Sequence, residues 1–257
     1  MDAQSSERPY AQDQAKSRAA DRVIAEAERL RNAGSADSLR KAIERYEAAL
    51  QLYRAADDRS REAATLNSIG LIYDSLGEKQ KALQFFNEAL AVLRVIADQS
   101  GEAVVLGNIG LVYSSLGDAQ RALDFYNRAL PILKAAGNHS GEASILNNIG
   151  RIYDSLSDRH RALELYSQAL ALWQAAGDAA GEASTLTNIG SAYDALGEAG
   201  KALECYRQAL LLLRKIGDRS GEATTLNNIG FLNSKRSDAE GALDYYAQAL
   251  TLWRALG

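Results

Sequence analysis

Few residues in this sequence are of the types that perform catalysis. Its 257 residues include two histidines, His139 and His160, and one cysteine, Cys205. A cysteine and a histidine together could supply a nucleophile and its base, but neither spacing nor context brings these residues together. Large apolar residues occupy the position of Cys205 in equivalent segments of the chain: Phe85, Phe125, Leu165 and Tyr245. We therefore expect a buried, unreactive thiol, no catalytic residue and no enzyme activity.

Metal and cofactor sites have no better support. The sequence contains no cluster of histidine and cysteine, and no acidic loop has the spacing of calcium ligands. We expect neither a metal nor a cofactor.

A row of asparagines is the strongest candidate for a binding site. At a constant interval along the chain one position reads Ser68, Asn108, Asn148, Asn188 and Asn228, and asparagine also precedes it at Asn67, Asn147 and Asn227. An asparagine side chain both donates and accepts hydrogen bonds. Such a row could pair with the alternating N–H and C=O groups of an extended peptide. Alternatively, the constant interval reflects a structural repeat, and each asparagine bonds to the backbone of the neighbouring repeat and sets the pitch of the repeat array.

Positions that vary between repeats would then select the partner. The residue after the recurring Ile-Gly pair is in turn Leu71, Leu111, Arg151, Ser191 and Phe231. Three residues after Arg151 and Ser191 stand two aspartates, Asp154 and Asp194. This pattern predicts a groove that is apolar in its N-terminal half and mixed, leaning acidic, in its middle. For the two aspartates, ordinary solvated surface charge is the alternative.

These residues depend on an internal repeat. Gly-Glu-Ala recurs at Gly101, Gly141, Gly181 and Gly221 without insertion or deletion, and 16 of the 20 glycines lie in register with it, against only two prolines in the chain. Self-similarity with a period of about 40 residues is typical of solenoid proteins.

Each repeat is predicted to form two antiparallel helices. Between residues 103 and 116 apolar residues recur at steps of three and four, which indicates a helix face. Ser100 stands where an N-cap would, and Gly117 marks the stop. A second apolar helix follows from about residue 119. The fold class is therefore all-α, a right-handed solenoid of about six helix pairs.

Glycine inside these helices calls for an explanation, because it makes the helix about 1 kcal/mol less stable than alanine would. It recurs at Gly70, Gly110, Gly150, Gly190 and Gly230. We expect a close approach of the facing helix, with Ala122 nearly touching the backbone at Gly110 and tyrosines packed around this contact.

The pattern resembles the tetratricopeptide repeat family. Leu106, Ile109-Gly110, Tyr113, Gly117, Ala122, Tyr126 and Ala129 fall at the spacing of the family signature, in five copies from residue 61 to 257. The 40-residue unit resembles kinesin light chain and LGN-type arrays, and still more the arrays that precede CHAT protease domains in bacteria. The resemblance implies a scaffold that binds an extended peptide or a helical partner in a concave groove lined by the first helix of each pair. A regulatory or sensor arm of a larger protein is the alternative.

The domain organisation follows from the register. Residues 1–20 are polar, and we expect them to be frayed; residues 21–60 read as a degenerate capping repeat. The five units are 61–100, 101–140, 141–180, 181–220 and 221–257. In the last unit Leu252, Trp253 and Leu256 form an apolar helix face with no polar capping helix after it. We expect either a continuing chain or self-assembly into a homo-oligomer through this face.

Composition excludes other partners. The formal net charge of −4 argues against a nucleic-acid binder. The N-terminal residues do not form a secretory signal, and no apolar run approaches the length of a membrane span. A single cysteine fits a reducing compartment. We therefore expect a cytoplasmic protein whose partner is a protein or peptide.

Overall fold

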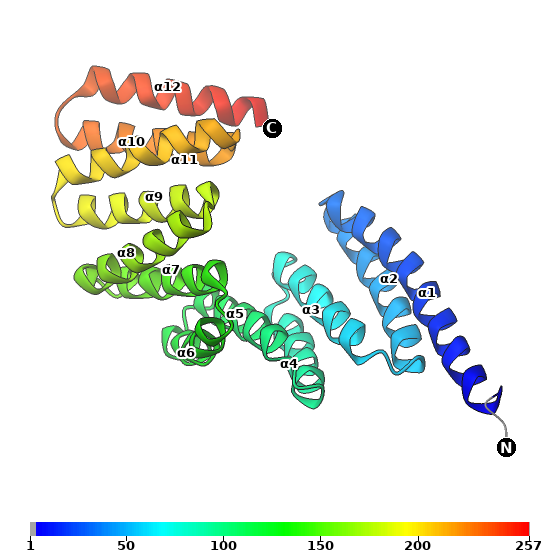
Figure 1. Cartoon of the computed structure of the whole chain (residues 1–257). Helices are drawn as coiled ribbons and strands as arrows, with labels where there is room; N and C mark the ends of the chain where they lie inside the picture. Colours follow the sequence, from blue (N-terminus) through cyan, green and yellow to red (C-terminus); the bar gives the residue numbers. More distant parts are fainter. Residues whose placement is uncertain (1–3, 257) are drawn as a thin grey trace. The chain divides into compact units, whose positions relative to one another are not determined.

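The part of the chain described by the structure, a computed structural model, consists of twelve α-helices and contains no strand (Figure 1). It describes residues 4–256, with the side chains of residues 14–256. The helices are α1 (Gln4–Asn32), α2 (Ala36–Ala55), α3 (Arg59–Ser75), α4 (Lys79–Val95), α5 (Gln99–Ser115), α6 (Ala119–Ala135), α7 (His139–Ser155), α8 (Arg159–Ala176), α9 (Ala179–Ala195), α10 (Ala199–Ile216), α11 (Arg219–Lys235) and α12 (Ala239–Leu256). The prediction of an all-α fold of six helix pairs is confirmed.

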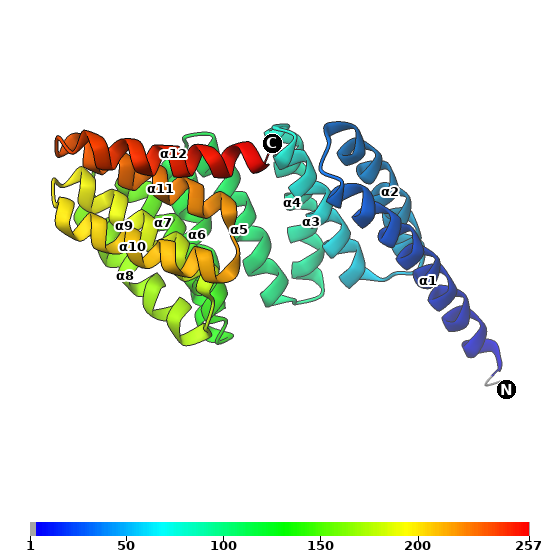
Figure 2. The ribbon, with the colours of Figure 1, turned by 90° about the horizontal axis from the view of Figure 1, so that it is seen from above.

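The helices form two compact units, Met1–Ile132 and Leu133–Gly257. Unit 1 holds α1 to α5 and most of α6, whereas unit 2 holds the end of α6 and then α7 to α12. Within each unit, consecutive helices pack side by side, as seen for α9 to α12 in Figures 1 and 2. We call the first member of each pair (α3, α5, α7, α9 and α11) a first helix, and the other member a second helix.

Each first helix begins after a side-chain cap. The Asp98 carboxylate accepts a hydrogen bond of 2.9 Å from the amide of Gly101, and Asp58, Asn138, Asp178 and Asp218 cap their helices in the same way. The prediction of Ser100 as the cap is wrong, because α5 starts at Gln99 and Ser100 lies in its first turn. Asp98 stands three residues before Gly101, which is the separation from which a cap side chain reaches that amide.

The turns between helices use a left-handed residue. Glycine takes this conformation at six repeat turns, for example Gly117 with φ of 77°. Four repeat turns place another residue there: Asp57, Ala97, Ser157 and Ser237, with φ between 52° and 65°. A side chain is strained in this region, whereas glycine is not.

The glycines inside the first helices lie beneath aromatic rings. A Cβ atom on Gly110 would stand 2.5 Å from Cε1 of Tyr126, and the rings of Phe86, Tyr166, Tyr206 and Tyr246 cover the equivalent glycines. The expected close approach with tyrosines packed around it is present: the ring of Tyr126 is nearest to Gly110, and at Gly230 the carbonyl oxygen of Ala242, the residue equivalent to Ala122, also lies 3.2 Å from the position of a Cβ atom. The aromatic ring buries more apolar surface than a methyl group would.

Neighbouring pairs are also joined by polar contacts. The side chain near the end of one second helix reaches the glutamate at the start of the next first helix. These pairs are Arg54–Glu62 (2.7 Å), Arg94–Glu102 (2.9 Å), Lys134–Glu142 (3.5 Å), Gln174–Glu182 (3.0 Å) and Arg214–Glu222 (2.7 Å). A contact that recurs from each repeat to the next fixes how consecutive pairs stack.

The two ends of the chain depart from the repeat. Helix α1 begins at Gln4, within the segment 1–20 for which we expected a frayed chain, and residues 1–3 lie outside the described part. At the other end, Tyr246 is only half-buried, although Tyr206 at the equivalent position is buried. None of the helices in the described part is long and apolar enough to cross a membrane.

Candidate functional site

The residues with catalytic potential do not assemble into a site. His139 opens α7, His160 lies in the first turn of α8, and both are exposed. Cys205 is half-buried against the core around Tyr166 and Ile189, and burial raises the pKa of its thiol. Among the described residues, no group of three or more histidine, cysteine, aspartate or glutamate side chains could hold a metal ion.

The predicted groove residues lie on the first helices, and in each unit separately we call the surface that they form the first-helix face. In unit 1 it includes Leu71 of α3 and Leu111 of α5, whose exposed fractions are 37% and 41%. In unit 2 it includes Arg151 of α7, Ser191 of α9 and Phe231 of α11, all exposed. The position after the helix glycine therefore faces solvent in every repeat, as a residue that selects a ligand must.

In unit 1 the asparagines bind each other. The Asn108 amide donates a hydrogen bond of 2.8 Å to the side-chain oxygen of Asn67, which joins α5 to α3. Ser68, at the position equivalent to Asn108, donates instead to the carbonyl of Ala64 within its own helix. The packing role considered for the asparagines is thus present, but it uses a neighbouring side chain rather than the backbone.

Unit 2 contains the same pair two repeats further along the chain. Asn147 accepts a hydrogen bond of 3.0 Å from the Asn188 amide, and another of 3.3 Å from the Thr185 hydroxyl. Asn148 and Asn228 make no side-chain hydrogen bond within the described residues, and both are only half-buried. The row therefore contains two kinds of asparagine, one tied to the preceding repeat and one whose amide is unused within the described chain.

The aspartates of the first-helix face are not simply solvated. Lys235 lies 2.6 Å from the Asp194 carboxylate, and its ammonium also stands over the ring of Phe231 at 5.3 Å. Arg159 lies 3.8 Å from Asp154. The acidic character expected near the middle of the array is therefore largely neutralised by these cations.

The pKa of the buried Tyr206 is raised, mainly by its burial. Burial, together with the negative charge of Asp194, raises the pKa of Tyr206 to about 12. Tyr206 is the ring that covers Gly190. Its hydroxyl therefore stays protonated further into the alkaline range than that of an exposed tyrosine.

A hollow opens between α9 and α11 on this face. Its volume is about 230 Å³, and Leu213 and Asp218 line it together with one amide and several short hydroxyl side chains: Asn188, Ser184, Thr187, Ser220, Thr224 and Thr225. The hollow can admit a ligand backbone next to the Asn188 amide.

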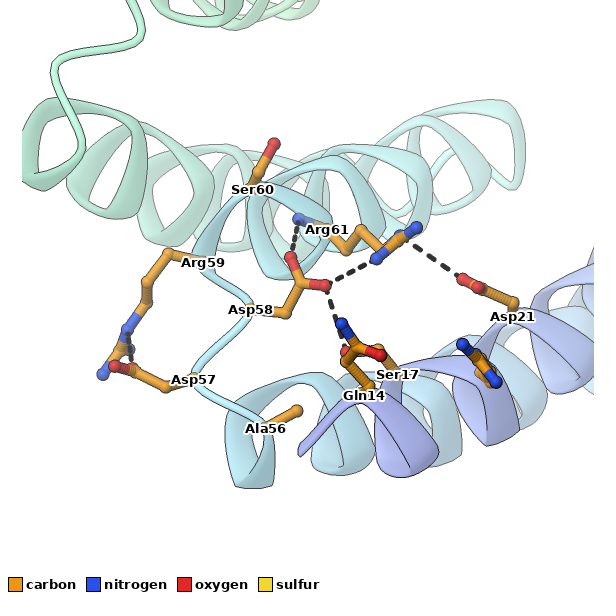
Figure 3. A pocket seen from close by; sticks show the side chains of 10 residues that line it. Gln14, Ser17, Asp21, Ala56, Asp57, Asp58, Arg59, Ser60 and Arg61 are labelled. Atoms are coloured by element: carbon orange, nitrogen blue, oxygen red, sulfur yellow. Dashed lines mark hydrogen bonds and ion pairs between the residues drawn. The ribbon is translucent and has the colours of Figure 1, made fainter. Parts of the chain in front are cut away.

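A larger polar hollow, of about 790 Å³, lies in unit 1 between α1 and the turn before α3 (Figure 3). Arg61 bridges the carboxylates of Asp58 (2.8 Å) and Asp21 (3.4 Å), and Ser17 donates to Asp58 at 3.2 Å. Burial opposes ionisation of Asp58, but the hydrogen bonds from Arg61 and Ser17 outweigh it, so its pKa is lowered. We interpret this cluster as a polar joint between α1 and α3, because its charges satisfy one another.

The sequence did not reveal the Arg61 cluster. Asp21 and Arg61 fall at equivalent positions of successive repeats, and the repeat pattern alone does not mark such positions as a contact. The signal that could have found them is their opposite charge at one repeat position, which a search for recurring apolar residues passes over.

The chain matches the family model of the tetratricopeptide repeat over residues 35–94, 101–175, 141–215 and 181–255. A comparison with curated proteins gives no match. Solved structures with a similar fold include BtubC (BKLC) from P. vanneervenii, with 21% identity, a TM-score of 0.71, and coverage of 93% of this chain and 92% of that one.

Two further similar structures are described as a sensor or as containing one. The apo form of the quorum sensor NprR from B. thuringiensis is 18% identical, with a TM-score of 0.63 over 83% of this chain and 60% of that one. The signal transduction ATPase PH0952 from Pyrococcus horikoshii, described as having a tetratricopeptide repeat sensor, is 16% identical, with a TM-score of 0.71 over 96% of this chain and 37% of that one.

Proposed function

Because this chain belongs to the tetratricopeptide repeat family, we propose that it is a protein-interaction module that holds an extended peptide on its first-helix face. The observation that carries the proposal is the unused hydrogen-bonding capacity of the asparagine row. Within the described chain the side-chain NH2 and C=O groups of Asn148 and Asn228 make no hydrogen bond, and Asn188 retains one N–H and its side-chain oxygen. An extended peptide presents groups of both kinds along its backbone.

Exposed side chains beside this row supply the selectivity. In unit 1, Leu71 and Leu111 offer apolar contacts; in unit 2, Phe231 offers an apolar contact and Arg151 a positive charge. In unit 2 these side chains favour a peptide that carries an apolar residue for Phe231 and an acidic residue for Arg151. Asp154 and Asp194 stay paired with Arg159 and Lys235 and contribute mainly by holding those cations in place.

The test uses peptides selected from a random 12-residue library against the full chain. Their affinity is then measured for the double variant Asn148→Ala/Asn228→Ala, with Asn127→Ala as a matched control on the exposed side of a second helix. We expect the double variant to bind about tenfold more weakly, because two amide contacts are lost, while its thermal unfolding is unchanged. Equal binding by the double variant and the original chain would refute the proposal.

A sensor arm within a larger protein is the second candidate. It is supported by the fold shared with PH0952, of which this chain covers only 37%. In that case the peptide bound at the first-helix face is a signal rather than a stable partner. Hydrogen exchange distinguishes the two, because a sensor should change its protection pattern beyond the contacted residues when the peptide binds.

A further inference from the structure

A small hollow of unit 1 lies among α1, α2 and α3, and its volume is about 250 Å³. Two aromatic and two aliphatic side chains form part of its lining: Tyr46, Tyr53, Ile24 and Ala64. Ser68, the first member of the asparagine row, lines it as well. A peptide held on the first-helix face of unit 1 would therefore pass beside this hollow.

The hollow carries a carboxylate where a later repeat carries an amide. Glu28 of α1 stands one repeat before Ser68, at the position that Asn188 occupies in α9, where Asn188 lines the hollow between α9 and α11. Asparagine both donates and accepts hydrogen bonds, whereas an ionised carboxylate only accepts them. A ligand group beside Glu28 must therefore be a donor, and a positively charged donor bonds most strongly to a carboxylate.

The charge of Glu28 is not neutralised by the described part of the chain. Glu28 makes no ion pair or hydrogen bond there, and it is exposed, so a ligand can reach it from solvent. The Arg61 guanidinium lines the same hollow, but Asp58 at 2.8 Å and Asp21 at 3.4 Å already hold it. Glu28 is thus available to a cationic ligand.

Tyr46 adds an unused polar group to the same hollow. It is only 2% exposed, and its hydroxyl has no hydrogen-bond partner among the described residues. Burial raises the pKa of this hydroxyl, the charge of Arg31 opposes the rise, and the charge of Glu28 adds to it. Arg31 makes no ion pair with Glu28 in the part of the chain that the structure describes. A ligand that donates a hydrogen bond to the Tyr46 hydroxyl would remove the penalty of burying it unpaired.

We propose that this hollow binds the lysine side chain of a peptide held on the first-helix face of unit 1. The inference rests on the proposed function, because it names one side chain of that peptide. The aliphatic stem of the lysine would lie against Ile24 and Ala64. Its ammonium would donate to the Glu28 carboxylate and to the Tyr46 hydroxyl, which come from α1 and α2. The three donors of an ammonium suit two separate acceptors, whereas the planar fork of an arginine suits one carboxylate.

The test uses the isotope-labelled full chain and the peptide acetyl-Ala-Ala-Lys-Ala-Ala-amide. Binding is followed by NMR through the backbone amides of Ala64, Thr65 and Ser68. We expect saturable shifts, and about tenfold weaker binding when norleucine replaces the lysine, because norleucine keeps the stem and lacks the ammonium. Thr224 and Thr225, at the equivalent positions beside α9, should not shift.

Two variants of the chain assign the contacts. Glu28→Gln should weaken binding of the lysine peptide about threefold, because it removes the charge and keeps the shape. Tyr46→Phe should weaken it by a similar factor without lowering the melting temperature, because the hydroxyl that it removes has no partner in the described chain. Glu47→Gln, the same change on an exposed glutamate of α2, is the matched control and should have no effect.

Three results would overturn the proposal: equal binding of the lysine and norleucine peptides, equal binding of an arginine peptide, or binding that neither Glu28→Gln nor Tyr46→Phe weakens. The library peptides keep this outcome separate from the proposed function. If they bind through Asn148 and Asn228 while the lysine peptide fails, the lysine site alone is refuted. If the lysine peptide binds while library peptides do not depend on those asparagines, the proposed role of the row is refuted and the lysine site stands.

Discussion

The side chains of Asn108 and Asn67 are joined by a hydrogen bond of 2.8 Å, donated by the Asn108 amide. The bond links α5 to α3, and Asn188 and Asn147 form the same link between α9 and α7. Asn148 and Asn228 stand at the donor position without such a bond in the described chain. If the row binds a peptide as proposed, Asn67 and Asn147 serve stability while Asn148 and Asn228 serve binding, and mutagenesis can test the two roles separately.

Removing the acceptor of such a pair should destabilise the fold. Asn67→Ala leaves the half-buried Asn108 donor without its partner, and we expect the free energy of unfolding to fall by about 1 kcal/mol. Asn227→Ala is the control, because Asn227 occupies the equivalent position and makes no side-chain hydrogen bond in the described part of the chain. Urea denaturation measures both. Equal losses in the two variants would show that the bond contributes nothing.

A methyl group beneath an aromatic ring should also destabilise the fold. Gly150→Ala would place Cβ 2.6 Å from Cε1 of Tyr166. The cost of overpacking is about 1–3 kcal/mol and outweighs the helix propensity gained, about 1 kcal/mol at most. Gly200→Ala is the control, because a Cβ there meets no atom within 4 Å; it should leave the melting temperature unchanged or raise it. A melting temperature for Gly150→Ala at or above that of the original chain would contradict this packing.

Replacing a strained turn residue with glycine should stabilise the fold. Ser157 has a φ of 65°, and Gly197 has a φ of 78° at the equivalent turn of the next repeat. Ser157→Gly relieves a strain of about 1–2 kcal/mol, part of which is offset by the greater freedom of glycine in the unfolded chain. We expect a net gain of about 0.5–1 kcal/mol by calorimetry. Gly197→Ser should have the opposite sign, and a loss of stability in Ser157→Gly would exclude turn strain.

Alkaline pH should weaken the fold through its buried tyrosines. Burial and the charge of Asp194 raise the pKa of Tyr206 to about 12, against about 10 in an unfolded chain. Between these values the folded state holds a proton that the unfolded state has released, so stability falls as pH rises. The loss is at most about 1.4 kcal/mol per pH unit for each such group. Urea denaturation at pH 9, 10 and 11 should show this decline, and Tyr206→Phe should reduce its slope; an unchanged slope would argue against the raised pKa.

Most of the fold could be predicted from the repeat. The spacing of Leu106, Ile109 and Gly110 predicted a helix because residues three and four apart share one helix face. The Asp98 cap was missed because the serine at position 100 is an equally good capping residue. Which of the two residues caps the helix depends on where the helix starts, and α5 starts at Gln99.

Side-chain partners across repeats could be predicted less well. The sequence placed Asn108 on a ligand-binding face, but the repeat period does not reveal that its amide reaches Asn67 in the preceding repeat. The same limit applies to Gly110, where the sequence predicted packed tyrosines without showing that the ring of Tyr126 lies directly over the glycine. Both contacts depend on how far each side chain extends between helices, which spacing along the chain does not specify.

The turns between helices affect how quickly proteases can digest the protein. Leu116, Gly117 and Asp118 form a whole turn, and each of their backbone N–H groups donates to a carbonyl nearby. A protease needs a stretch of extended, unbonded chain, and such turns do not provide one. Cleavage at these turns must therefore wait for a helix to unwind, so the rate of digestion reports the local opening of the array.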